Sequence, residues 1–144
     1  MDMKRLTTGA IVGGITLFVL GYLTYGMLLA GFFEANAGGA TGAAREAPIF
    51  WAVGLGEVLM GALLTLAIIK TGASGWAECA KVAAVVGFLA WGAVDLIHYG
   101  VMDVMNLTAA LVDPFVEIVR HGIAGAAIAM VAGGKAAAAS ASEY

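Results

Sequence analysis

Residue types on which catalysis and disulfide bonding usually depend are scarce in this sequence. It contains one cysteine, Cys79, which excludes an internal disulfide and a metal cage built from several cysteines. Because Cys79 lies among alanines near an expected helix start, we interpret it as a small packing residue. Serine occurs only at Ser74, Ser140 and Ser142, in an expected connection and the tail, so serine chemistry inside a membrane is excluded.

Charge and functional motifs are scarce as well. Charged residues make up 12% of the chain, the formal net charge is −3, and no cluster of Lys and Arg offers a surface for nucleic acid. The sequence contains no Gly-rich phosphate loop, no nucleophile elbow and no H-E-x-x-H zinc motif. We therefore expect a protein that is not an enzyme and has no nucleic-acid partner.

Hydrophobic residues are abundant instead. They make up 62% of the 144 residues, and the mean hydropathy is +0.96. Soluble domains contain roughly 45–50% apolar residues, and a soluble chain of this length could not hide the excess. The composition predicts an all-α integral membrane protein whose solvent is the lipid bilayer.

Four apolar segments are long enough for the roughly 20 residues that a spanning helix requires. We predict a single four-span domain, a four-helix bundle, over residues 1–134. Its spans are expected at residues 8–30, 47–69, 79–102 and 113–133. The first apolar run far exceeds the roughly 7–15 residues of a signal-peptide core, so it is expected to remain as an uncleaved helix.

Local signals suggest where two of the helices begin. Pro48 suits the first turn of the second helix, where its missing N–H costs nothing. Asp113 followed by Pro114 reads as a helix start, with Asp as the N-cap. Residues 103–112 stay open between a loop and a surface-lying turn of helix. The Ala/Ser-rich tail at 135–144 is expected to be flexible.

The distribution of Lys and Arg predicts the orientation. Basic residues flank the N-terminus, the second connection and the C-terminus, at Lys4, Arg5, Lys70, Lys81 and Lys135. The other two connections contain only Arg45, together with several acids. By the positive-inside rule, both termini are expected to be cytoplasmic.

Small residues recur at helical spacing along the spans. In the fourth span Gly125, Ala129 and Gly133 lie four residues apart, the small-xxx-small pattern that lets helix backbones approach closely. Gly and Ala in the first and third spans are spaced in a similar way. The pattern predicts tight helix packing, and a homo-oligomer or a larger membrane complex is the expected assembly.

Three stretches resemble a known group of proteins. Residues 18–26, FVLGYLTYG, and 32–36, FFEAN, are similar to small bacterial membrane proteins of unknown function. So is the stretch 101–114, which contains MNLT at 105–108. The resemblance implies four spans that fill nearly the whole chain and a setting in the bacterial inner membrane. It assigns no role to any residue.

Six ionisable residues lie inside the predicted spans, where such groups are costly and often functional. This candidate polar cluster consists of Glu57, Asp95, His98, Glu117, Arg120 and His121. Counted at about 1.5 Å of rise per residue from the expected helix ends, all six lie in the outer half of the membrane. Helical spacing places Asp95 with His98, and Glu117 with His121, on shared faces that are expected to point into the bundle.

The main interpretation of the cluster is structural. Arg120 is expected to pair with Asp95 or Glu57 in a buried network that fixes helix register, and the protein is then a structural or accessory membrane subunit. Nearby Tyr22, Tyr25 and Tyr99 are interpreted as an aromatic belt at the interface. Asp103 and Asp113 are interpreted as solvated acids that flank the last outer connection.

Three other uses of the cluster stay open. Carboxylate and imidazole ligands would suit Zn, Mn or Fe, with possible ligands Glu57, Asp95, His98, Glu117 and His121. Chains of carboxylates and histidines also carry protons or solutes in transporters. A third use is a haem held by His98 and His121, although the flanking acids are unwelcome beside a macrocycle. No cofactor is favoured.

Overall fold

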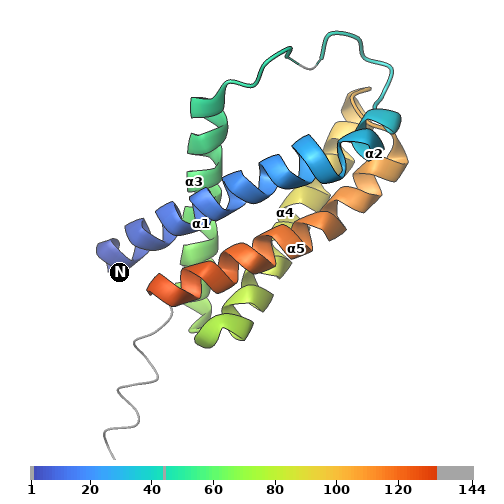
Figure 1. The fold of residues 1–144 in the computed structure, drawn as a ribbon. Coiled ribbons are helices and arrows are strands. Elements are labelled where there is room, and N and C mark those ends of the chain that lie inside the picture. The colour runs from blue at the N-terminus through green and yellow to red at the C-terminus, as the bar shows by residue number, and fades with distance from the viewer. Residues whose placement is uncertain (1, 44, 133–144) are drawn as a thin grey trace, which may run out of the picture.

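The computed structural model describes residues 2–43 and 45–132, and helices dominate this part of the chain (Figure 1). The tail at 135–144 and Gly133 lie outside the described residues. The helical elements are α1 (Met3–Leu23), a π-helical turn η1 (Thr24–Leu28), α2 (Ala30–Ala35), α3 (Phe50–Thr71), α4 (Gly75–Val101) and α5 (Leu107–Ala132).

Four of these segments are long and apolar enough to cross a membrane. They are Met3–Leu28, which combines α1 with η1, and the helices α3, α4 and α5. Large apolar side chains remain exposed on them, among them Trp51, Phe115 and Met130. A water-soluble surface rarely leaves so much apolar area uncovered. The prediction of an all-α chain with four long apolar helices is confirmed.

The four long helices do not pack equally against one another. Helix α4 lies along α5, and α1 packs against both α5 and α3, whereas α3 meets α4 and α5 much less extensively. In Figure 1, α3 crosses α1 and its Phe50 end stands apart from the neighbouring ends of α4 and α5. The helical bundle is therefore open on one side at this end.

Small residues permit the two closest helix contacts. Between α1 and α3, a Cβ at Gly14 would lie 2.7 Å from the Cα of Val58, and a Cβ at Gly61 would overlap the backbone of α1. Between α4 and α5, a Cβ at Gly125 would lie 2.5 Å from both the Cβ of Ala83 and the carbonyl oxygen of Cys79. The close approach predicted from the spacing of small residues is confirmed.

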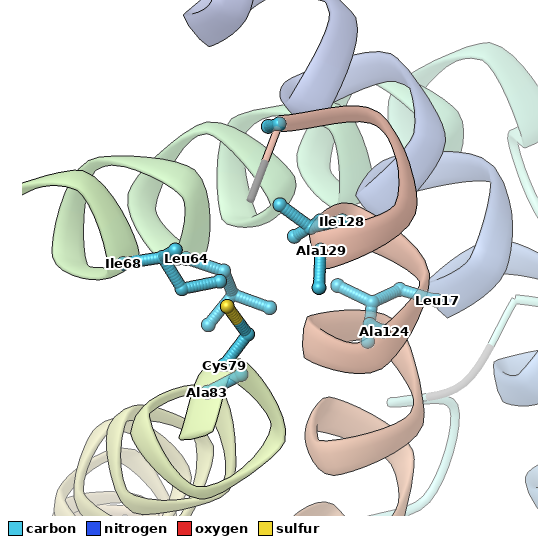
Figure 2. Close-up of a cluster of buried hydrophobic side chains, with 9 residues drawn as sticks. Leu17, Leu64, Ile68, Cys79, Ala83, Ala124, Ile128 and Ala129 are labelled. Atoms are coloured by element: carbon cyan, nitrogen blue, oxygen red, sulfur yellow. The ribbon is translucent and has the colours of Figure 1, made fainter. Parts of the chain in front are cut away.

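The apolar core, drawn in Figure 2, lies toward the end of the bundle at which α1 begins and α5 ends. It draws on all four long helices and includes Cys79, which is fully buried, as expected for a packing residue. At the same end, Arg5 Nε donates to the carbonyl of Ala132, which joins the start of α1 to the end of α5. The core residues are Leu17, Leu64, Ile68, Cys79, Ala83, Ala124, Ile128, Ala129 and Ala132.

Two predicted helix starts are wrong. Pro48 precedes α3, which begins at Phe50, so Pro48 is not in its first turn. Helix α5 begins at Leu107 rather than at Asp113, and Pro114 lies inside it. The reason is Asn106, whose side-chain oxygen accepts from the backbone N–H of Ala109 at 3.0 Å and caps the helix more than a turn earlier. The residues 107–112, left open above, are helical.

The two connections at the end away from the termini are joined to each other. Asn106 Nδ2 donates to Asn36 Oδ1 at 3.0 Å, and the backbone N–H of Asn106 donates to the carbonyl of Asn36 at 2.9 Å. Nearby, Ala40 N–H donates to the carbonyl of Asp103 at 2.8 Å. The stretches that carry the resemblance, 32–36 and 105–108, therefore meet at this pair of asparagines.

Candidate functional site

Polar side chains from all four long helices surround one cavity at the open end of the bundle. The cavity has a volume of about 600 Å³. Of the six residues in the predicted cluster, five line it: Glu57, Asp95, His98, Glu117 and Arg120. The sixth, His121, is buried behind them. The fold thus brings the predicted residues together.

Arg120 occupies the centre of the polar groups. Its Nη1 donates to the carboxylate of Glu117, and its Nη2 donates to Glu57 Oε1 at 3.1 Å and to the carbonyl oxygen of Leu17 at 3.0 Å. Gly21 leaves room for this guanidinium, because a Cβ there would lie 2.8 Å from Nη2. One side chain therefore joins α5 to α3 and α1. The predicted pairing is found with Glu57 and not with Asp95.

Tyr25 links the same network to a carboxyl group that was not expected there. Its hydroxyl oxygen lies 2.5 Å from Asp113 Oδ1 and 2.6 Å from Glu117 Oε1. Its ring lies under Arg120, with 5.1 Å from the guanidinium carbon to the ring centroid, in cation–π geometry. We call Tyr25, Glu57, Asp113, Glu117, Arg120 and His121 the Arg120 network.

Two expectations are corrected by these contacts. Tyr25 does not belong to an interfacial aromatic belt, because its hydroxyl binds the buried acids. Asp113 is not a solvated loop acid, because it is 8% exposed within α5. Asp113 and Glu117 are four residues apart and share one helix face. A prediction that the helix starts after Asn106 would have placed Asp113 and Glu117 on one helix face from the sequence alone.

The π-helical turn places Tyr25 in the network. Leu29 N–H donates to the carbonyl of Thr24 at 2.7 Å, the five-residue spacing of a π turn, in the segment that contains Tyr25. Such turns change the direction of the following side chains and are frequent at functional sites. No residue pattern in the sequence indicated this turn.

His121 packs behind Glu117 and is 1% exposed. Its Nδ1 lies 2.7 Å from Glu117 Oε2 and 3.1 Å from the Glu117 carbonyl oxygen. Its ring lies against Gly87 of α4, where a Cβ would overlap it. The absence of a side chain at Gly87 therefore makes the space that this histidine fills.

Helix α4 supplies the wall of the cavity opposite the Arg120 network. Asp95 is 3% exposed and lies beside the carboxyl group of Asp113. Asp95 Oδ2 and Trp91 Nε1 are buried and have no hydrogen-bond partner. The two residues are four apart on one face of α4. His98 lines the cavity from the same helix and is partly exposed.

The geometry does not assemble a metal centre or a haem site. Among the described residues, no group of three or more His, Cys, Asp and Glu side chains is arranged to hold a metal ion. Glu57 and Glu117 are already occupied by Arg120. His121 is packed against Gly87, which lies about 16 Å along α4 from His98. Two histidines this far apart along the bundle do not ligate one haem iron from opposite sides.

Comparison of the chain with protein-family models, with curated proteins and with solved structures found no match. The cavity and the residues around it are therefore the features from which a function is inferred.

Proposed function

We propose that the chain is a multi-pass protein of a bacterial inner membrane, with both termini in the cytoplasm. The four long apolar helices support insertion, and the basic residues Lys4, Arg5 and Lys70 at the terminal end support this orientation. The resemblance described above supports the bacterial setting. The cavity then lies in the outer half of the membrane.

Labelling with a membrane-impermeant maleimide tests the orientation. Thr41 lies in the connection that precedes α3, Thr71 is the last residue of α3, and both are exposed. In intact cells we expect the label to reach Thr41→Cys and not Thr71→Cys, while permeabilised cells expose both. The reverse pattern would overturn the orientation. Buried Cys79 gives the background in the unaltered chain.

Within that membrane, the proposed role is that of a structural or accessory subunit. The observation that carries this proposal is the position of Arg120, which holds three helices in one arrangement through Glu57, Glu117 and Leu17. A network of this kind fixes the register of the helices and takes no part in a reaction. The bilayer surrounds the subunit, and the proposed partner is a further copy or a larger membrane complex.

Gentle extraction tests this role. A tagged chain purified in a mild detergent is expected to carry a stoichiometric partner or to run as a defined homo-oligomer. The partner should be lost with Arg120→Met, because the helices lose their register, and retained with Arg45→Met, which alters an exposed connection. Isolation as a lone monomer under all mild conditions would contradict the proposal.

The cavity favours a second candidate function, a proton or solute pathway. Asp95, Asp113, Tyr25 and Glu117 follow one another from the cavity wall to His121, so exchangeable protons extend into the bundle. Liposomes that contain the protein and a trapped pH dye test this function. A proton flux that Glu57→Gln abolishes supports it, and equal leakage with and without protein removes it.

A further inference from the structure

The size and walls of the cavity suit an aromatic or amphipathic molecule. Its volume of about 600 Å³ lies within the roughly 300–1,000 Å³ of pockets that hold drug-sized ligands. Aromatic rings attract cations through the negative charge on their faces. The aromatic side chains that line the cavity, apart from Tyr25, are Phe18, Tyr22, Phe33, Phe50 and Trp91.

The charges around the cavity favour a positive ligand. Four carboxyl groups face it, those of Glu57, Asp95, Asp113 and Glu117, against the one guanidinium of Arg120. Both terminal nitrogens of that guanidinium are occupied by protein oxygens. The third nitrogen, Nε, has no partner but is buried, so an anionic ligand would meet four carboxyl groups against one guanidinium whose terminal nitrogens are occupied.

One carboxyl group has an unused acceptor. Asp95 is 3% exposed, lines the cavity and leaves Oδ2 without a partner. A buried carboxylate oxygen without a donor is costly, so a donor supplied by a ligand is strongly favoured. Trp91, one turn earlier on the same face, offers an indole ring beside it.

The contacts of Tyr25 require a proton on one of its two carboxyl partners. Its hydroxyl oxygen has carboxyl oxygens at 2.5 and 2.6 Å, yet a phenol donates one hydrogen bond only. Glu117 Oε1 also accepts from Arg120, so Glu117 is the ionised partner. The additional proton therefore lies on Asp113, which donates to Tyr25 while Tyr25 donates to Glu117.

From these observations we propose that the cavity is a binding site for a lipophilic organic ammonium ion. The ammonium donates to Asp95 Oδ2, its apolar part lies against the aromatic walls, and one proton held by the adjoining carboxyl groups of Asp95 and Asp113 leaves as the cation enters. One positive charge replaces another, so the total charge of the site is unchanged. The proposal rests on the second candidate function, because it names the solute class of that pathway.

The titratable groups around the exchanged proton come from every helix packed there. They are Tyr25 of η1, Glu57 of α3, Asp95 and His98 of α4, and Glu117, Arg120 and His121 of α5. Among these groups, Asp113 lies directly beside Asp95, and Tyr25 connects it to the rest of the Arg120 network.

Three ligands of one shape test the ligand class on the unaltered protein. 2-Naphthylmethylammonium, 2-naphthylmethanol and 2-naphthoate carry a cationic, a neutral and an anionic group on the same ring. Equilibrium dialysis against protein in nanodiscs of zwitterionic phosphatidylcholine is expected to show saturable 1:1 binding of the ammonium, with the alcohol at least tenfold weaker and the carboxylate weaker still. Equal affinity for all three would overturn the proposal, and empty nanodiscs give the background.

Two matched variants test the residue. Asp95→Asn is expected to weaken ammonium binding at least tenfold and to leave the alcohol unaffected. Glu46→Gln removes a carboxylate from an exposed connection and should change neither. Elution of Asp95→Asn at the volume of the unaltered protein verifies its fold. If it does not fold, the preference among the three ligands still decides the proposal.

The proton displacement has its own measurement. If one proton leaves, ammonium affinity rises about tenfold per pH unit wherever the empty site still holds that proton. A pH dye in weakly buffered solution should report one proton released per ligand bound. Asp113→Asn keeps a donor for Tyr25 but removes one of the two adjoining acids, so its binding should depend less on pH and release fewer protons per ligand. Binding without proton release in the unaltered protein would overturn the exchange.

The outcomes also separate this proposal from the pathway on which it rests. A liposomal proton flux that Glu57→Gln abolishes, together with no preference for the ammonium ligand, would retain the pathway and reject the ligand class. Ammonium binding without any flux would retain the site and reject the pathway.

Discussion

Arg120 and Glu57 join α5 to α3 through an ion pair of 3.1 Å at the point where α3 begins to leave the bundle. The guanidinium is 5% exposed and the carboxylate 18%. Beyond this pair, toward Phe50, the surface of α3 is mostly exposed. The ion pair therefore marks the boundary between the packed part of the bundle and the cavity.

Replacing Arg120 with Met should destabilise the protein strongly. The substitution leaves Glu57 and Glu117 without their cation, and removing one partner of a buried ion pair costs about 3–5 kcal/mol. Unfolding in mixed micelles with increasing SDS measures the loss. The control is Arg45→Met, in an exposed connection, which is expected to leave the transition unchanged. Adding Glu57→Gln and Glu117→Gln to Arg120→Met should recover part of the loss.

A methyl group at Gly87 should also destabilise the protein. Its Cβ would overlap the ring of His121, which has to move away from Glu117, and overpacking of this kind costs about 1–3 kcal/mol. The matched control is Gly100→Ala on the same helix, where no atom lies within 4 Å of the added carbon. Thermal denaturation in detergent measures the stability of both variants. Equal stability of the two would contradict the packing of His121 against Gly87. His121→Ala should relieve the effect of Gly87→Ala.

Removing the hydroxyl of Tyr25 separates its polar contacts from its packing. Tyr25→Phe leaves Asp113 and Glu117 without their shared partner, and an unsatisfied buried group costs about 1–3 kcal/mol. Tyr22→Phe, which removes a hydroxyl from a residue that is 63% exposed, is the control. A difference in stability between the two variants, measured by SDS unfolding, is the expected result.

Asn106→Ala should loosen the start of α5. It removes the cap on Ala109 and the side-chain bond to Asn36, and loss of an N-cap costs about 1 kcal/mol. Hydrogen exchange in the first turn of α5 should accelerate, while the turn that contains Ala124 stays protected. Thr108→Ala, at an exposed position of the same turn, should exchange at the original rate. Unchanged exchange in Asn106→Ala would show that the helix begins elsewhere.

The sequence revealed the long helices and much of the site for one physical reason. A charged residue in an apolar run is conspicuous, so Glu57 and Arg120 could be selected, and their common depth followed from helical rise. The Arg120–Glu57 pair was one of the expected outcomes. Neither step requires knowledge of how the helices pack.

What the sequence did not reveal depends on competing local signals and on tertiary contacts. Asp113-Pro114 is a strong helix start, but the cap from Asn106 and its bond to Asn36 begin the helix earlier. Asp113 was therefore assigned to a loop. Tyr25 enters the network because η1 is a π turn. The divergence of α3, which makes the cavity, arises from unequal packing between helices far apart in the sequence.

The glycine contact between α1 and α3 has a mechanical consequence. Gly14 and Gly61 let the two backbones approach closely beside Val58, the neighbour of Glu57, whereas a Cβ added at Gly54 or Gly56 would meet no atom within 4 Å. Helix α3 is therefore held beside the ion pair: the part after Val58 packs in the core, and the part before Glu57 forms a side of the cavity. A bend of α3 at this point would change the width of the cavity mouth and leave the packed part in place.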